Sequence, residues 1–383
     1  MKLRSASGVA TVACAGALAW WTLRAPEAPA DPRREVAPPP VVLLEGAPDG
    51  TETRVVLRAT STGAQPRVLG AVTHIAGSAR RGTLSRTASR TSVYVVAAER
   101  ESRHGSTYES ALWLVEDGSP PRRLVGGVTD ASRAAVTARG AVVVQRGRDG
   151  EDPALVDHVL RERVDALTLD VVDPANGAAR TVWSGRGMIA FLAAAMQGDE
   201  VLVYHVHEGG AALFALDVVS GSTRPLIAQM DALARDFSYD AVHDEVAFVR
   251  ASQRREGTWE VVTLPAHGPA RSPESLQTRW RATSDHLMPR MLRDGAIVIS
   301  LPDDRGLGVL RAFPQMPERV APLGDGADEA LGESDDGRWL ALRHRAPNRE
   351  VLGLYDRVSH RSIEVDRPEV YTEFVGFTRA VSP

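Results

Sequence analysis

The feature that most constrains the fold is a short apolar run that recurs along most of the chain. It occurs as Val93–Val96, Ala141–Val144, Val201–Tyr204, Val246–Val249, Ala296–Ile299 and Trp339–Leu342, with starts 48, 60, 45, 50 and 43 residues apart. Runs of this length between turn residues are typical of buried strands. Self-similarity at a period of roughly 40 to 50 residues indicates the blades of a β-propeller.

Further strands and turns follow these runs. Leu213–Leu216 precedes a Ser220-Gly221 turn, and Arg224–Ile227 follows it. Between the runs there is almost no helical periodicity, although a doubly wound α/β fold would need helices there. The sequence therefore predicts an all-β fold of four-stranded antiparallel blades.

The two ends of the repeat region are incomplete and complement each other. Val55–Arg58 and Pro66–Leu69 resemble the outer half of a blade, whereas Glu373–Thr378 resembles an isolated inner strand. Joining them would complete one blade from both chain ends and remove a free sheet edge. The 343 residues from Val41 to Pro383 correspond to seven units of 49 residues. We predict seven blades in a domain over 41–383, with six as the alternative.

The N-terminal 40 residues have the composition of an export segment and a spacer. Met1–Arg4 is basic and Ser5–Leu23 carries no charge, which is the pattern of a secretory signal. We expect residues 1–30 to be a signal peptide or an uncleaved membrane anchor, with residues 5–23 as the tether. Residues 31–40 are rich in proline and are interpreted as a stiff linker. The expected location is the periplasm or outside the cell.

The composition excludes several functional classes. With 45 basic and 49 acidic residues the net charge is −4, so there is no positive excess to favour nucleic acid. Cys14 is the only cysteine, which excludes a disulfide framework and a Cys-rich zinc site. The sequence has no nucleophile elbow, zincin helix, phosphate-binding loop or dinucleotide fingerprint. We therefore expect no cofactor.

Two segments carry a resemblance to a known family. Phe237–Asp240 followed by Val246–Phe248, and Ser334–Ala341, are similar to the WD-repeat-like units of TolB-type periplasmic propellers. The resemblance implies a periplasmic propeller with a binding role. TolB-type proteins carry an additional domain before the propeller, whereas here we expect only the signal and the linker. Within the second segment, Ser334–Trp339 is interpreted as an ordinary strand-connecting turn.

The loops between the second and third strands of the blades are the predicted binding surface. Their polar side chains include Arg100, Arg103, His205, His207, Arg254, Arg255, Asp303, Asp304, Arg343, His344 and Arg345. Arginine's planar fork suits carboxylates, acidic sugars or an acidic protein surface. One loop, 149–164, is longer than the others and is predicted to contain a short amphipathic helix. It would be either a lid or a docking surface.

The sequence leaves three hypotheses open, one of which is a degenerate propeller that is retained for structural assembly. The favoured one is a non-catalytic, monomeric scaffold that binds a protein or an envelope polymer on the loop face. The alternative is a propeller lyase or hydrolase acting on an acidic sugar or lactone. In that case His205 and His207, two residues apart on a strand, could share a channel metal with a third ligand that the sequence does not identify.

Overall fold

Antiparallel β-sheets make up almost all of the regular structure. The computed structural model describes residues 36–47, 49–60, 65–85, 91–101, 108–130, 132–147, 166–195, 198–230, 234–252, 255–301, 306–311, 317–320, 327–346, 349–365 and 370–378. The sheets belong to one unit, Ala37–Pro383. Residues 5–23 and the expected helix over 149–164 lie outside the described part. Within that part, no helix is long and apolar enough to cross a membrane.

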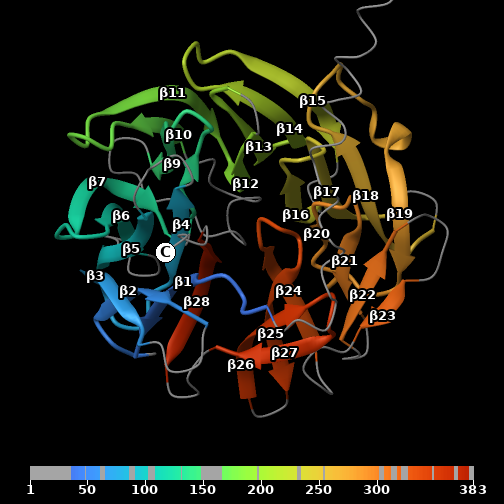
Figure 1. The fold of residues 1–383 in the computed structure, drawn as a ribbon. Coiled ribbons are helices and arrows are strands. Elements are labelled where there is room, and N and C mark those ends of the chain that lie inside the picture. Colours follow the sequence, from blue (N-terminus) through green and yellow to red (C-terminus); the bar gives the residue numbers. More distant parts are fainter. Residues whose placement is uncertain are drawn as a thin grey trace, which may run out of the picture. The chain divides into compact units, whose positions relative to one another are not determined.

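The strands follow one another along the chain around the ring (Figure 1). They are β1 (Val41–Gly46), β2 (Glu52–Arg58), β3 (Arg67–Thr73), β4 (Arg80–Ser85), β5 (Ser92–Glu101), β6 (Tyr108–Glu116), β7 (Arg122–Thr129), β8 (Ala135–Val136), β9 (Val142–Gly147), β10 (Ala166–Val172), β11 (Ala179–Arg186), β12 (Met188–Ala194), β13 (Glu200–His207), β14 (Gly210–Asp217), β15 (Thr223–Met230), β16 (Arg235–Asp240), β17 (Glu245–Ala251), β18 (Trp259–Pro265), β19 (Gln277–Ala282), β20 (Arg290–Met291), β21 (Ile297–Ser300), β22 (Leu307–Leu310), β23 (Glu318–Val320), β24 (Ala327–Glu333), β25 (Trp339–Ala346), β26 (Arg349–Asp356), β27 (Arg361–Glu364) and β28 (Tyr371–Phe377). Among the described residues, the one helical element is the 3₁₀ turn η1 (Pro273–Ser275).

The strands form an all-β propeller of four-stranded antiparallel blades. Five sheets have the orders β28-β1-β2-β3, β12-β13-β14-β15, β16-β17-β18-β19, β20-β21-β22-β23 and β24-β25-β26-β27. A sixth sheet has eight strands, in the order β11-β10-β9-β7-β6-β5-β4 with β8 paired to β9. Its two halves are joined by a single residue pair, Val128 in β7 and Arg146 in β9. The recurring apolar runs lie in β5, β9, β13, β17, β21 and β25, which confirms the repeat interpretation.

One strand at the edge of each four-strand set lies nearest the centre (Figure 1). Going round the centre, β28, β4, β8, β12, β16, β20 and β24 each contact the next, and β24 contacts β28. Inner strands pack closely, and glycines make room for them. An added Cβ on Gly82 of β4 would lie 2.6 Å from Val375 Cγ2 of β28, and one on Gly332 of β24 would lie 2.8 Å from Phe374 Cε1.

The chain ends complete one blade together, as predicted. β28 pairs antiparallel with β1, with Val41 opposite Phe377 and Gly46 opposite Tyr371. The Thr378 amide also donates to the Pro40 carbonyl at 2.9 Å. The C-terminal strand is therefore the inner strand of the N-terminal blade.

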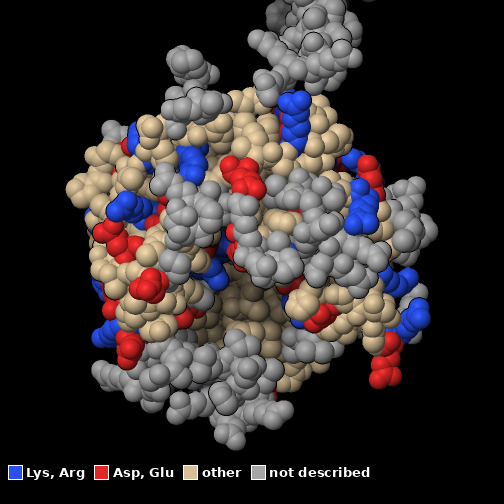
Figure 2. All heavy atoms as spheres, turned by 90° about the horizontal axis from the view of Figure 1, so that it is seen from below, with Lys and Arg blue, Asp and Glu red and all other residues tan. Residues whose placement is uncertain are grey.

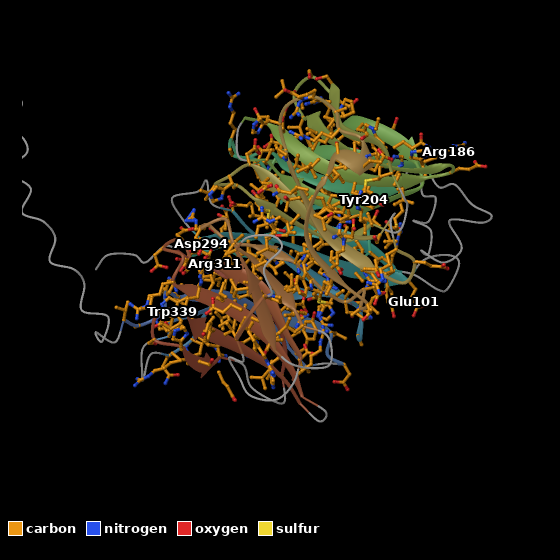
Figure 3. The ribbon with its side chains drawn as sticks, turned by 90° about the vertical axis from the view of Figure 1, so that its right-hand side faces the viewer. Glu101, Arg186, Tyr204, Asp294, Arg311 and Trp339 are labelled. Atoms are coloured by element: carbon orange, nitrogen blue, oxygen red, sulfur yellow. The ribbon has the colours of Figure 1, made fainter. Side chains whose placement is uncertain are left out.

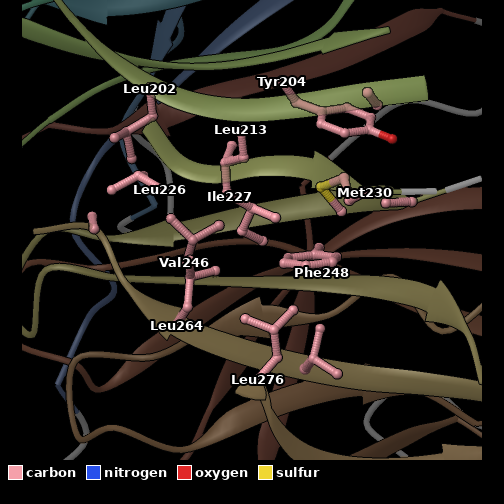
Figure 4. Close-up of a cluster of buried hydrophobic side chains, with 14 of the residues drawn as sticks. Leu202, Tyr204, Leu213, Leu226, Ile227, Met230, Val246, Phe248, Leu264 and Leu276 are labelled. Carbon is pink, nitrogen blue, oxygen red and sulfur yellow. The ribbon is translucent and has the colours of Figure 1, made fainter. Parts of the chain in front are cut away.

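Apolar side chains between neighbouring blades form the core. In strands the side chains alternate between the two faces, so each sheet buries one set against each neighbour. Leu202, Tyr204 and Leu213 pack in this way against Val246 and Phe248 of the next blade (Figure 4). Each Å² of apolar surface that these side chains bury stabilises the folded ring by about 25 cal/mol.

The Ser334–Trp339 segment is the strand-connecting turn that the sequence predicts. It joins β24 to β25, and the Trp339 amide donates to Ser334 Oγ at 2.9 Å. Gly337 has a φ of +72°, a backbone conformation that favours glycine. The segment therefore has a structural explanation.

Candidate functional site

The strand directions divide the side chains between two faces of the propeller. Inner strands begin on the face where the second and third strands of each blade are joined, and we call it the hairpin face. In Figure 3, Arg186 and Glu101 lie at this end of the strands. Asp294, Arg311 and Trp339 lie at the opposite end. The described parts of the predicted binding loops lie on the hairpin face.

Most predicted residues that the structure describes are already engaged. Arg100 pairs with Glu109, which lies opposite it in the same hairpin. Arg343 and Arg345 both contact Glu329 and Glu350. Arg103, Arg254, Asp303 and Asp304 lie outside the described residues. Arg255 is exposed and makes no side-chain hydrogen bond or ion pair with the described residues.

The two histidines of β13 lie on one face of the strand, as the spacing predicts. Their ring centroids are 5.2 Å apart. His205 is buried, packs edge-on against Trp183, and donates from Nε2 to the Arg186 carbonyl at 2.7 Å. Burial lowers the pKa of His205 below 6.5. Within the residues described, no three His, Cys, Asp or Glu side chains gather as a metal site would require.

His344 lies apart from its arginine neighbours. Its Nδ1 donates to Asp328 Oδ1 at 2.9 Å, and both side chains are buried. Burial raises the pKa of Asp328, and His344 partly offsets this effect. The second carboxylate oxygen of Asp328 is buried without a hydrogen-bond partner. This pair joins β24 to β25.

Carboxylates on this face are also used to hold strands together. Glu260 of β18 accepts hydrogen bonds from Arg250 at 3.1 Å, Arg281 at 2.8 Å and Ser252 at 3.1 Å. Burial would raise the pKa of Glu260, but the hydrogen bonds from Arg281 and Arg250 outweigh burial and lower it. Glu260 is therefore an ionised structural acceptor.

A second charged group lies at the start of the inner strands and was not predicted. We call Arg81, Arg133, Arg290, Glu329 and Glu373 the axial cluster. Their positions are the beginnings of β4, β20, β24 and β28 and the residues just before β8. Two of them follow another charged residue, Arg81 after Arg80 and Glu329 after Asp328, and no sequence motif distinguishes the five. Only the ring arrangement of the inner strands brings Arg81 and Arg133 to Glu373.

Glu373 links three segments of this cluster. Its side chain is 2% exposed, accepts a hydrogen bond from Arg81 Nη1 at 2.8 Å and forms an ion pair with Arg133 Nη2 at 3.0 Å. The Gly82 amide donates to Glu373 Oε1, the oxygen that also contacts Arg133, at 3.3 Å. Arg133 also donates to the Gly82 carbonyl at 2.9 Å.

The exposed charges are mixed rather than of one sign. Figure 2 shows acidic and basic side chains close together around a recess that is lined by uncharged residues. Arg186 at the end of β11 is exposed and has no side-chain partner among the described residues. Arg186 and Arg255 are thus two exposed guanidiniums on the hairpin face that carry no counter-ion there.

Comparison with known proteins concerns the fold. No protein-family model matches the sequence, and no curated protein matches it. A putative 6-phosphogluconolactonase from Bacteroides uniformis is similar in structure, with 13% identity and a TM-score of 0.55 over 88% of this chain and 100% of that one. A Mycobacterium tuberculosis puromycin-hydrolyzing peptidase has 16% identity and a TM-score of 0.54 over 91% of this chain.

TolB from Acinetobacter baumannii also matches, with 10% identity and a TM-score of 0.49 over 88% of this chain. The chain spans 66% of that TolB chain and 55% of the peptidase. The TolB-type family stays a prediction at this level of similarity. The lactonase-like and peptidase matches establish that the chain has the β-propeller fold.

Proposed function

We propose that the protein is an exported, non-catalytic scaffold whose hairpin face binds a partner bearing acidic groups. The partner would be an envelope protein or an acidic envelope polymer. The observation that carries the proposal is the pair of exposed, unpartnered guanidiniums, Arg186 and Arg255, on the face where the loops gather. Arginine forms bidentate hydrogen bonds with carboxylates, so such residues favour an acidic partner.

The state of the ionisable groups favours binding over catalysis. His205 donates to a backbone carbonyl, His344 is paired with Asp328, and Glu260 accepts from two arginines. A general acid or base needs a free position from which to exchange a proton with a substrate. These groups are instead committed to contacts that hold strands together.

The architecture suits a scaffold, and we infer seven blades. The eight-stranded sheet is joined at one residue pair, so its halves β4–β7 and β8–β11 are best treated as two blades. The order of contacts among the inner strands supports the same number. The signal-like residues 1–30 support export to the periplasm or beyond, and we propose a monomer.

A second function, a lactone or acidic-sugar hydrolase or lyase, has one specific observation in its favour. The fold likeness covers the whole of a chain whose name is a putative 6-phosphogluconolactonase. His205 and His207 on one strand face would be the first residues to substitute under this hypothesis. Lactone hydrolysis by the purified full chain, lost on His207→Ala, would favour the enzyme.

The scaffold proposal is tested with a fluorescently labelled oligoglutamate peptide and the purified full chain. Fluorescence anisotropy gives the dissociation constant, and an oligolysine peptide of equal length is the specificity control. We expect saturable binding of oligoglutamate that weakens with salt, because exposed charges are screened. The Arg186→Ala/Arg255→Ala double variant should bind at least about tenfold more weakly, as expected when two charge-assisted contacts are lost.

Arg311→Ala is the matched control for this experiment. Arg311 is an exposed arginine on the opposite face (Figure 3) and its removal should leave the dissociation constant unchanged. Equal weakening by both variants would mean that binding follows total charge and not the hairpin face. That result, or tighter binding of oligolysine, would contradict the proposal.

A further inference from the structure

The connection between β3 and β4, residues 74–79, lies on the hairpin face and is bonded to strands on both sides of it. The His74 amide donates to the Thr51 carbonyl, just before β2, at 2.8 Å. The Ile75 amide donates to the Ala98 carbonyl of β5 at 3.0 Å. The connection therefore ties the first blade, β28-β1-β2-β3, to the strands of the next one.

The imidazole of His74 is hydrogen-bonded at both of its nitrogens. Nδ1 faces the Ile75 carbonyl at 2.8 Å, and a carbonyl only accepts, so Nδ1 carries a hydrogen and donates it. Nε2 lies 2.8 Å from Thr53 Oγ1, and the same oxygen accepts from Arg80 Nε at 3.1 Å. The Thr53 hydroxyl therefore donates its own hydrogen to Nε2. The hydrogens of this chain all point one way, from Arg80 through Thr53 and His74 to Ile75.

This chain accepts one hydrogen on the imidazole and not two. A second hydrogen, on Nε2, would turn the Thr53 hydroxyl away from its acceptor, although Thr53 is 1% exposed. A buried donor that loses its acceptor costs free energy. Burial lowers the pKa of His74 below 6.5; the Ile75 and Glu52 carbonyls oppose this shift, and the charge of Arg80 adds to it. The closed connection therefore requires neutral His74.

Arg80 is a fixed positive charge beside this imidazole. It is 2% exposed, and it forms no ion pair with the residues that the structure describes. Its guanidinium lies 4.4 Å from the centre of the Tyr371 ring. Burial lowers the pKa of Arg80, whereas Tyr371 and Glu373 of β28 raise it, and an arginine keeps its charge at any physiological pH. The Glu52 side chain pairs with Arg54 at the surface and does not compensate this charge.

We propose that residues 74–79 form an acid-sensitive latch, in which neutral His74 holds the first blade to the next one and protonated His74 releases the connection. Opening would place the imidazole in water, where its ordinary pKa of about 6.5 applies. The open connection therefore binds the proton more readily than the closed one. The latch is fully closed above about pH 6.5, and below it the open fraction rises by up to about tenfold per pH unit until the closed form is itself protonated.

NMR of the full chain with ¹⁵N-labelled histidine measures the tautomer and the pKa of His74 directly. At about pH 8 the imidazole should carry its hydrogen on Nδ1, with Nε2 bare, and it should titrate with a midpoint below its ordinary value. His205 is an internal reference for the other tautomer, because its Nε2 donates to the Arg186 carbonyl. The signal that disappears in His74→Gln assigns the residue. A hydrogen on Nε2 of His74, or a midpoint at or above 6.5, would overturn the latch.

Hydrogen–deuterium exchange, corrected for the intrinsic effect of pH on amide exchange, measures the release itself. Protection of residues 74–79 should fall at least about threefold between about pH 7 and about pH 5. Residues 293–296 on the opposite face should keep their protection over the same range. The change should therefore be local, and the whole protein should stay folded.

Two variants separate the latch from a general effect of acid. In His74→Gln, which does not titrate, protection of residues 74–79 should not depend on pH; His74→Asn takes its place if that variant does not fold. His286→Gln removes an imidazole that is 72% exposed and should leave the pH profile unchanged. A pH-independent connection in the unsubstituted chain would overturn the latch. An equal loss of protection in the His74 variant, or a loss spread over both faces, would overturn it too.

Discussion

Glu373 is the carboxylate by which the last strand of the chain is tied to the strands that follow it around the ring. It lies in β28, accepts a hydrogen bond from Arg81 of β4 and forms an ion pair with Arg133, which lies just before β8. Glu373→Gln keeps the shape of the side chain and removes its charge. The expected result is a loss of stability without a change in fold.

The magnitude follows from how exposed each partner is. Glu373 is 2% exposed, but Arg81 is 33% and Arg133 is 50% exposed, so water can solvate both guanidiniums once the charge is gone. Breaking a fully buried ion pair costs about 3–5 kcal/mol, and surface pairs contribute about 0–1 kcal/mol. Glu373→Gln should therefore lower the free energy of unfolding by about 2 kcal/mol, between these limits.

Urea unfolding, followed by circular dichroism and by tryptophan fluorescence, measures this difference. Coincident transitions are required before a free energy is assigned. Glu109→Gln is the matched control, because its pair with Arg100 is surface-exposed, and it should cost less than about 0.5 kcal/mol. A double-mutant cycle with Arg81→Gln should give a coupling energy of about 1 kcal/mol. If Glu373→Gln and Glu109→Gln lowered the free energy of unfolding by the same small amount, with no coupling energy between Glu373 and Arg81, Glu373 would not tie β28 to its neighbours.

Three other predictions concern single side chains. Burial would raise the pKa of the Asp356 carboxyl, but hydrogen bonds from Arg338 and the Val358 amide outweigh burial and lower that pKa to about 2. The ionised carboxylate therefore contributes about 2 kcal/mol of folding stability above about pH 4, and this contribution is lost as the pH falls towards 2. Acid unfolding of Asp356→Asn should lack this pH dependence. Phe374→Ala, which empties a site in the core cluster between the first and last blades, should cost about 3–5 kcal/mol in urea unfolding, and a cost below about 1 kcal/mol would contradict this packing. Burial lowers the pKa of His205, so the unfolded state takes up the proton first and stability should fall as the pH drops below about 6.5; His205→Gln should flatten that part of the profile.

Periodicity predicted the fold because each blade repeats the same strand pattern. Val201–Tyr204 and Leu213–Leu216 lie in β13 and β14 as expected, and Glu373–Thr378 overlaps the inner strand β28. The closing of one blade by both chain ends follows from the need to pair an otherwise free edge. The number of blades was less accessible, because the inner strand β8 has only two residues and β7 meets β9 at one pair.

The candidate site was less predictable because contacts across the ring leave no local pattern. Arg100 was selected as a loop residue, but Glu109 lies opposite it in the hairpin and neutralises it. Arg81 and Glu373 are 292 positions apart in the sequence, and only the ring brings them into contact. Charge in a loop can be read from the sequence, whereas the availability of that charge depends on its partners.

Hydrogen–deuterium exchange of the full chain, with and without bound oligoglutamate, would show which face of the propeller the peptide occupies. Binding through the hairpin face should slow exchange in residues 184–188 and 255–259. Residues 293–296 and 335–338, which lie on the opposite face, should be unaffected. Protection confined to the opposite face, or spread evenly over both, would contradict a scaffold that binds through its hairpin face.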